Sequence, residues 1–278
     1  MQELLESEGQ NMDTSEAKMI LKEEGEEVVK KINEDVPSHS FDLKTSVSIR
    51  LANFESSEKY LEEIYKKAEN DEKVFSAHQI DGEIKYGKVS VRDEKLIFNS
   101  LSLSQVPEDS LLIFFNDVKK CVGNNNFQTF IKISCNEKMV ARMVCFEMGD
   151  KQLSTQFIKL CTGECGPSYK NSSFKQDIQS GNSQDILVVE KKFENIDKLE
   201  EYKVSACKVN CRFYFYANEM YLIVKPNGNF LITRAIQNIT MNTHPNGRVV
   251  YPTNLYHYLT SSNASFMKIL ECGILFIL

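Results

Sequence analysis

Apolar and polar positions between residues 41 and 122 follow two different periods. Residues 45–51 alternate polar and apolar side chains, which predicts a half-buried strand. Residues 56–69 repeat apolar positions at the spacing of one helix face, and Ser56 or Ser57 can cap the N-terminus of this predicted helix. A strand followed by a helix is typical of the beginning of a small α+β module.

The rest of this segment predicts a meander of three or four strands. Residues 74–80 and 83–91 flank Asp81-Gly82, a strong signal for a two-residue hairpin turn. Residues 95–103 predict a further strand, and residues 107–121 fit either a helix or a strand. The segment carries no nucleotide-binding loop, nucleophile elbow or metal-ligand spacing. We therefore interpret residues 41–122 as a protein-binding surface or as a cover for the following domain.

Strands predominate again beyond the polar linker that starts at residue 123. Residues 129–134 and 142–147 alternate as strands do, and residues 157–161 place apolar side chains on one helix face. Residues 207–216 alternate and are rich in aromatic side chains. Basic residues do not cluster with these aromatic residues, so we interpret the stretch as a strand and not as a nucleic-acid stacking surface. The last five residues, 274–278, are apolar and predict a packed or protein-contacting strand.

The charge is distributed unevenly along the chain. The 278 residues carry a net charge of −6, and residues 1–40 contain eleven Asp or Glu against four Lys. This acidic segment has few aromatic residues, so we expect a largely disordered or helical tail. A helix over residues 15–33 that docks on a partner is the alternative. The remaining residues are nearly neutral, which disfavours nucleic acid as a partner.

Cysteine usage and hydropathy indicate a reducing compartment. No apolar run reaches the roughly 18 residues that a membrane helix needs, and no signal peptide is visible, so we expect no membrane association. The eight cysteines are then expected to be reduced thiols in the cytoplasm or nucleus. Cys161/Cys165 and Cys207/Cys211 form C-x3-C pairs, but zinc sites favour two intervening residues. We expect no metal and no cofactor, and we interpret His78, alone within a strand pattern, as structural.

Several motifs beyond residue 123 occur in an order that points to one family. They are Arg142 to Glu147, Leu160-Cys-Thr-Gly-Glu164, Tyr169-Lys-Asn-Ser-Ser-Phe174 and Ile269-Leu-Glu-Cys-Gly273. This order resembles the cyclophilins, the cyclosporin-binding prolyl isomerases. The resemblance implies a mainly β (α+β) chain. Residues 123–278 would form an eight-stranded antiparallel β-barrel with two capping helices, preceded by the α+β module of residues 41–122 and the acidic tail of residues 1–40.

The resemblance also locates a peptide-binding groove and shows where this chain departs from the family. Prolyl isomerases need an apolar pocket for the proline ring and a donor that favours the twisted amide. Gln176 occupies the position of the catalytic Arg, which removes a charge-assisted donor. The apolar wall that should follow is shortened. The chain contains no Trp, and Ile239 is nearest to the position of the family's Trp, so we expect no cyclosporin binding. The resemblance places the remaining groove residues at Phe174, Gln179, Asn218, Leu231 and His244.

Two functional hypotheses follow. In the first, the domain is a degenerate cyclophilin that binds a protein or a proline-containing peptide and has weak or no isomerase activity. In the second, it is a slow prolyl isomerase that assists protein folding, with Gln176 or Lys175 partly replacing the Arg.

Overall fold

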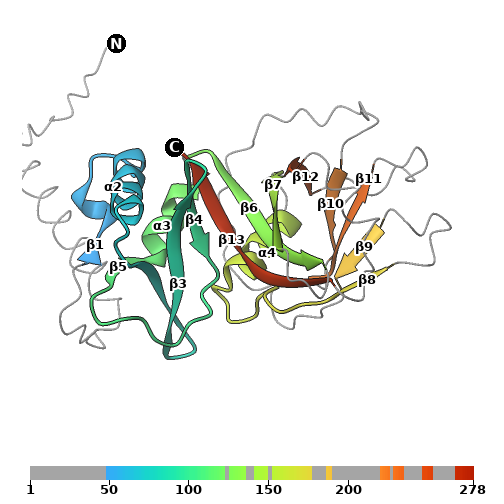
Figure 1. The fold of residues 1–278 in the computed structure, drawn as a ribbon, viewed down its shortest axis with the longest axis horizontal. Coiled ribbons are helices and arrows are strands. Elements are labelled where there is room, and N and C mark those ends of the chain that lie inside the picture. The colour runs from blue at the N-terminus through green and yellow to red at the C-terminus, as the bar shows by residue number, and fades with distance from the viewer. Residues whose placement is uncertain are drawn as a thin grey trace, which may run out of the picture. The chain divides into compact units, whose positions relative to one another are not determined.

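A computed structural model describes residues 48–122, 125–135, 141–149, 152–176, 186–189, 220–225, 228–234, 246–252 and 267–278 (Figure 1). This part of the chain is mostly β-structure, as the sequence predicts, and it contains three α-helices. The predicted tail of residues 1–40 and the predicted strand of residues 207–216 lie outside it. The elements are β1 (Ser48–Ile49), η1 (Leu51–Asn53), α2 (Ser57–Glu69), β2 (Val74–Ile80), β3 (Glu83–Arg92), β4 (Lys95–Asn99), β5 (Leu111–Phe114), α3 (Phe115–Val122), β6 (Phe127–Cys135), β7 (Ala141–Met148), α4 (Gln152–Thr162), β8 (Phe174–Gln176), β9 (Ile186–Val189), β10 (Met220–Val224), β11 (Phe230–Arg234), β12 (Gly247–Tyr251) and β13 (Met267–Ile277).

The described strands form one large open sheet. Its order is β1-β5-β2-β3-β4-β13-β6-β7-β12-β10-β11-β9-β8. All pairs are antiparallel except β1–β5 and β2–β5, which are parallel. Strands from residues 41–122 and from residues 123–278 thus belong to the same sheet, and residues 46–278 form one compact unit.

Local signals determine the elements of the first half. Ser56 caps α2, because its Oγ accepts a hydrogen bond from the Lys59 backbone N–H at 3.3 Å. Asp81 and Gly82 both have positive φ, 50° and 83°, as the predicted hairpin turn between β2 and β3 requires. Residues 107–121, which fitted either a helix or a strand, contain both, β5 followed directly by α3. The described part of the predicted strand of residues 45–51 contains β1 and, at Leu51, the start of the short 3-10 helix η1.

Strand β13 joins the two halves of the chain. It pairs with β6 along nearly its whole length, and its second half pairs with β4 on the other side, with Gly273 opposite Asn99. The backbones approach closely at this point: a Cβ on Gly273 would lie 2.0 Å from the Phe98 carbonyl oxygen. Glycine at this position therefore lets β4 and β13 pair.

On the edge of β13 that faces away from β6, the neighbouring segment changes along the strand. Near its start, Lys268 forms an isolated bridge with Ser173, just before β8. The Asn171 N–H donates to the Ile269 carbonyl at 2.7 Å, and the Ile269 N–H donates to the Ser172 carbonyl at 2.8 Å. The register with β6 shifts between Ile269 and Glu271, and beyond this shift β4 takes over as the neighbour. This change of partner positions the cavity described below.

The two faces of the sheet carry unequal cores. One face, with the helices, holds a single large apolar cluster that includes residues from both halves, such as Tyr60, Phe98, Phe157 and Phe276. The other face holds a small separate cluster of Ile97, Phe130, Cys145 and Leu275, each at most 4% exposed. The small cluster lies where β4, β13, β6 and β7 run side by side.

Candidate functional site

The described part of the predicted groove consists of Phe174, Leu231 and the strands around them. Phe174 is buried, and its ring lies 6.2 Å from that of Phe230 in an edge-to-face arrangement, so it contributes to the large core. Leu231 is half-buried between the buried Phe230 and Ile232, as expected for alternating positions of a strand. Gln179, Asn218, Ile239 and His244 lie outside the described residues.

Strand register determines which of these positions align. Leu231 on β11 pairs with Val188 on β9, and Val188 pairs with Lys175 on β8. Gln176, at the predicted Arg position, pairs with Leu187, which pairs with Ile232. The backbone of Lys175, and not that of Gln176, is therefore in the cross-strand row of Leu231.

An aromatic cluster behind β11 holds this region in place. The Phe157 ring, on α4, lies 5.2 Å from the Phe230 ring and 5.3 Å from the Tyr169 ring. Burial raises the pKa of Tyr169 well above its usual value, so its hydroxyl stays neutral and donates to the Gly228 carbonyl at 2.6 Å. The motifs that carry the resemblance thus supply the C-terminal end of α4 and the buried Tyr169, which support β11.

Residues after α4 contact the first half of the chain through a charged group. The buried Glu164 carboxylate accepts from the Lys119 ammonium on α3 at 3.1 Å. Burial lowers the pKa of His78 on β2, the nearby Glu164 carboxylate opposes this shift, and the His78 ring packs edge-on against Phe115 at 5.7 Å. These contacts fit the structural role expected for His78. Cys161 is buried and burial raises its pKa well above the usual value, so its thiol stays protonated.

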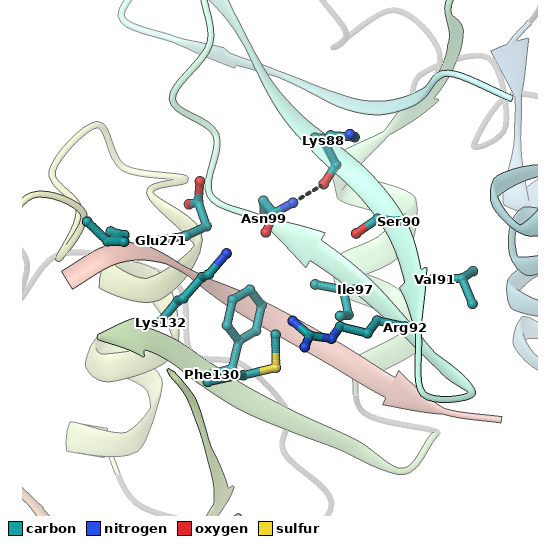
Figure 2. A pocket seen from close by; sticks show the side chains of 11 residues that line it. Lys88, Ser90, Val91, Arg92, Ile97, Asn99, Phe130, Lys132 and Glu271 are labelled. Atoms are coloured by element: carbon teal, nitrogen blue, oxygen red, sulfur yellow. Dashed lines mark hydrogen bonds between the residues drawn. The ribbon is translucent and has the colours of Figure 1, made fainter. Parts of the chain in front are cut away.

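The structure also contains a cavity that the sequence did not predict. It has a volume of about 450 Å³ and lies across β3, β4, β13, β6 and β7, where β13 changes its partner (Figure 2). This volume is within the range of ligand pockets, about 300–1,000 Å³. The small apolar cluster contributes its floor through Ile97 and Phe130, and Met143 packs beside them. We call this site the basic cavity.

Three cationic side chains line the basic cavity. Lys88 and Arg92 come from β3, and Lys132 comes from β6. Arg92 contacts the Asp93 carboxylate at 3.6 Å, whereas Lys88 and Lys132 make no ion pair within the described part of the chain. Figure 2 shows Arg92 and Lys132 extending toward the Phe130 ring from different sides, while Val91 points away.

The single carboxylate in the lining is already engaged by other side chains. Glu271 accepts from the Lys170 ammonium at 2.6 Å and from the Ser100 hydroxyl at 2.5 Å. Lys170 also donates to the Ser102 hydroxyl at 2.9 Å. Glu271 therefore pairs with Lys170, and Lys88 and Lys132 have no ion-pair partner among the described residues.

Sequence reasoning missed the basic cavity because its lining comes from five strands. A signal was present on β3, where Lys88, Ser90 and Arg92 alternate with the core-facing Val89 and Val91. Comparison with family models and with curated proteins returns no match for the chain. Among the described residues, no helix is long and apolar enough to cross a membrane.

Proposed function

We propose that residues 123–278 form a degenerate cyclophilin-type domain that binds a protein or a proline-containing peptide, with prolyl isomerase activity weak or lost. The observation that carries the proposal is Gln176 on β8, where the resemblance requires the cationic donor. A neutral amide forms a weaker hydrogen bond to the twisted amide than a guanidinium does. The binding surface is retained in this proposal, and the rate enhancement is not.

The contacts of β13 support this domain type. Eight strands, β13-β6-β7-β12-β10-β11-β9-β8, are successive neighbours. The bridge between Ser173 and Lys268 then brings the segment before β8 back to β13. We propose that these eight strands close into the barrel that the resemblance implies, with α4 as one of its two capping helices. No cyclosporin binding is expected, because the chain lacks Trp.

A slow isomerase is the second candidate function, and the register of β8 supports it. The backbone of Lys175 is in the cross-strand row of Leu231, and this lysine is one residue from the predicted Arg position. Both candidates belong to a cytoplasmic or nuclear protein in our proposal. Five cysteines among the described residues are free thiols, which agrees with a reducing compartment; they are Cys121, Cys145, Cys161, Cys165 and Cys272.

A prolyl isomerisation assay on the full chain separates the two candidates. The full chain is required, because β4 and β13 pair across the boundary between the halves. We expect cis–trans exchange of an Ala-Pro tetrapeptide, measured by NMR, to remain at the uncatalysed rate while the peptide still perturbs the spectrum. Exchange well above that rate, abolished in Lys175→Met, would establish the slow isomerase.

The Gln176→Arg variant tests whether the groove is retained. If the loss of the cation is the main defect, this variant gains isomerase activity, and Gln176→Lys gains less because it cannot form the planar, forked contact. A chain that neither binds the tetrapeptide nor gains activity with Arg contradicts the proposal of a retained groove.

A further inference from the structure

We propose that the basic cavity binds an acidic peptide segment that carries one apolar side chain between its carboxylates. The three cations Lys88, Arg92 and Lys132 supply the attraction, and the floor of Ile97 and Phe130 receives the apolar side chain. The proposal does not depend on the proposed function. The cavity lies on β3, β4, β13, β6 and β7, whereas the predicted groove involves β8, β9 and β11.

The described residues compensate only part of the positive charge in the basic cavity. Lys88 and Lys132 have no ion-pair partner in the described structure, and Arg92 has only a distant one, since Asp93 lies 3.6 Å away. Glu271 could have neutralised Lys132, which is opposite it in the β13–β6 register. Lys170 and Ser100 engage Glu271 instead, so Lys132 stays available to an incoming carboxylate.

The floor of the basic cavity accounts for the apolar side chain. Phe130 lies beside Gly273, where a Cβ would be 3.0 Å from its Cε1 atom. The missing side chain at Gly273 leaves the Phe130 ring close to the β13 backbone, and Met143 extends the apolar surface. Ile97 and Phe130 are already buried, so the gain comes from the peptide side chain: a Phe or Leu placed here loses its own contact with water, which adds affinity and selects against purely polar anions.

The size and charge of the site favour a peptide over a nucleic acid. Nucleic-acid binding commonly uses about 6–10 phosphate contacts, and the lining supplies three cations. A short segment with a few carboxylates requires no more positive charge than the cavity offers.

The test uses the full chain and a fluorescein-labelled peptide with two Asp or Glu residues on each side of one central Phe. Fluorescence anisotropy is expected to show saturable binding that weakens several-fold as ionic strength rises from about 0.05 to 0.5 M. Lys88→Met and Lys132→Met keep the aliphatic stems and remove the charges. Each is expected to weaken binding about two- to fivefold, and the double variant is expected to weaken it further.

Matched controls make the result specific to the basic cavity. Lys66 is an exposed lysine of α2 outside the lining, and Lys66→Met is expected to leave binding unchanged. Replacing the central Phe of the peptide by Gly is expected to weaken binding, and replacing the acidic residues by Lys is expected to abolish it. Circular dichroism melts check that each variant folds.

Three results would overturn the proposal: no binding at millimolar peptide, an equal loss with Lys66→Met, or tighter binding of a single-stranded oligonucleotide of the same charge. An unlabelled Ala-Pro tetrapeptide added to the bound complex distinguishes the two proposed sites. It is not expected to displace the acidic peptide, so failure of either proposal leaves the other testable.

Discussion

Replacing Gly273 by Ala introduces a single methyl group at the junction of the two halves of the chain. The new Cβ would lie 2.0 Å from the Phe98 carbonyl oxygen and 3.0 Å from Phe130 Cε1. Ordinary van der Waals contact begins at 3.4 Å, so the first distance is about 1.4 Å too short. The clash is with backbone, which cannot rotate away, so β4 and β13 must separate locally.

The sign of the change in unfolding free energy shows whether Gly273 is in close contact with the β4 backbone. In a strand without such a neighbour, Ala is expected to be more stable than Gly by roughly 0.5–1 kcal/mol, because it loses less backbone entropy on folding. At Gly273, overpacking costs about 1–3 kcal/mol, and each β4–β13 hydrogen bond that breaks costs about 0.5–1.5 kcal/mol more. We expect the free energy of unfolding to fall by about 3 kcal/mol, which corresponds to a Tm lowered by about 6–12 °C.

Urea unfolding and thermal melts of the wild type, Gly273→Ala and a control measure this difference. Lys268→Ala is the control, because Lys268 is an exposed residue of the same strand and does not contact β4. Its effect is expected to stay within about 0.5 kcal/mol. A Gly273→Ala chain as stable as the wild type would refute the close approach of β4 and β13.

Two further predictions concern the core and the pH dependence of stability. Phe157→Ala removes a fully buried ring that contacts three other rings. Urea titrations are expected to show that the free energy of unfolding falls by about 3–5 kcal/mol. A loss below about 1 kcal/mol would contradict this packing. Because burial lowers the pKa of His78, the fold disfavours the protonated ring, so stability is fully present above about pH 6.5 and declines as the pH falls below it. Unfolding titrations from pH 8 to 5.5 are expected to show a shallower decline in the free energy of unfolding for His78→Gln than for the wild type. Identical profiles would contradict the role of His78 in this pH dependence.

Elements with a local signal could be predicted from the sequence. The Ser56 cap and the Asp81-Gly82 turn each depend on residues within a few positions, and both occur as predicted. Residues 107–121 could not be assigned to one type, because the short apolar strand β5 continues into α3 without a break. Periodicity needs several repeats of one pattern, and neither element supplies them.

Long-range pairing could not be predicted. β5 pairs in parallel with β2, and β4 pairs with β13 from the other end of the described chain. Nothing in the alternation of residues 95–99 indicates which distant strand will lie beside them, since any apolar strand would satisfy the pattern. The basic cavity could not be predicted for the same reason. Lys88 and Lys132 each resemble an ordinary solvent-facing strand position, and only the strand order brings them to one cavity.

The position of β13 between β4 and β6 also affects how the chain folds during synthesis. Both neighbours are translated long before residues 267–277, and each keeps a free hydrogen-bonding edge until β13 emerges. Pairing β13 with β4 or β6 joins segments that are far apart in the sequence, and this is slow compared with forming hairpins such as β2–β3. The nascent chain therefore carries two apolar strand edges from the synthesis of β6 until that of β13, when contact with other chains leads to aggregation.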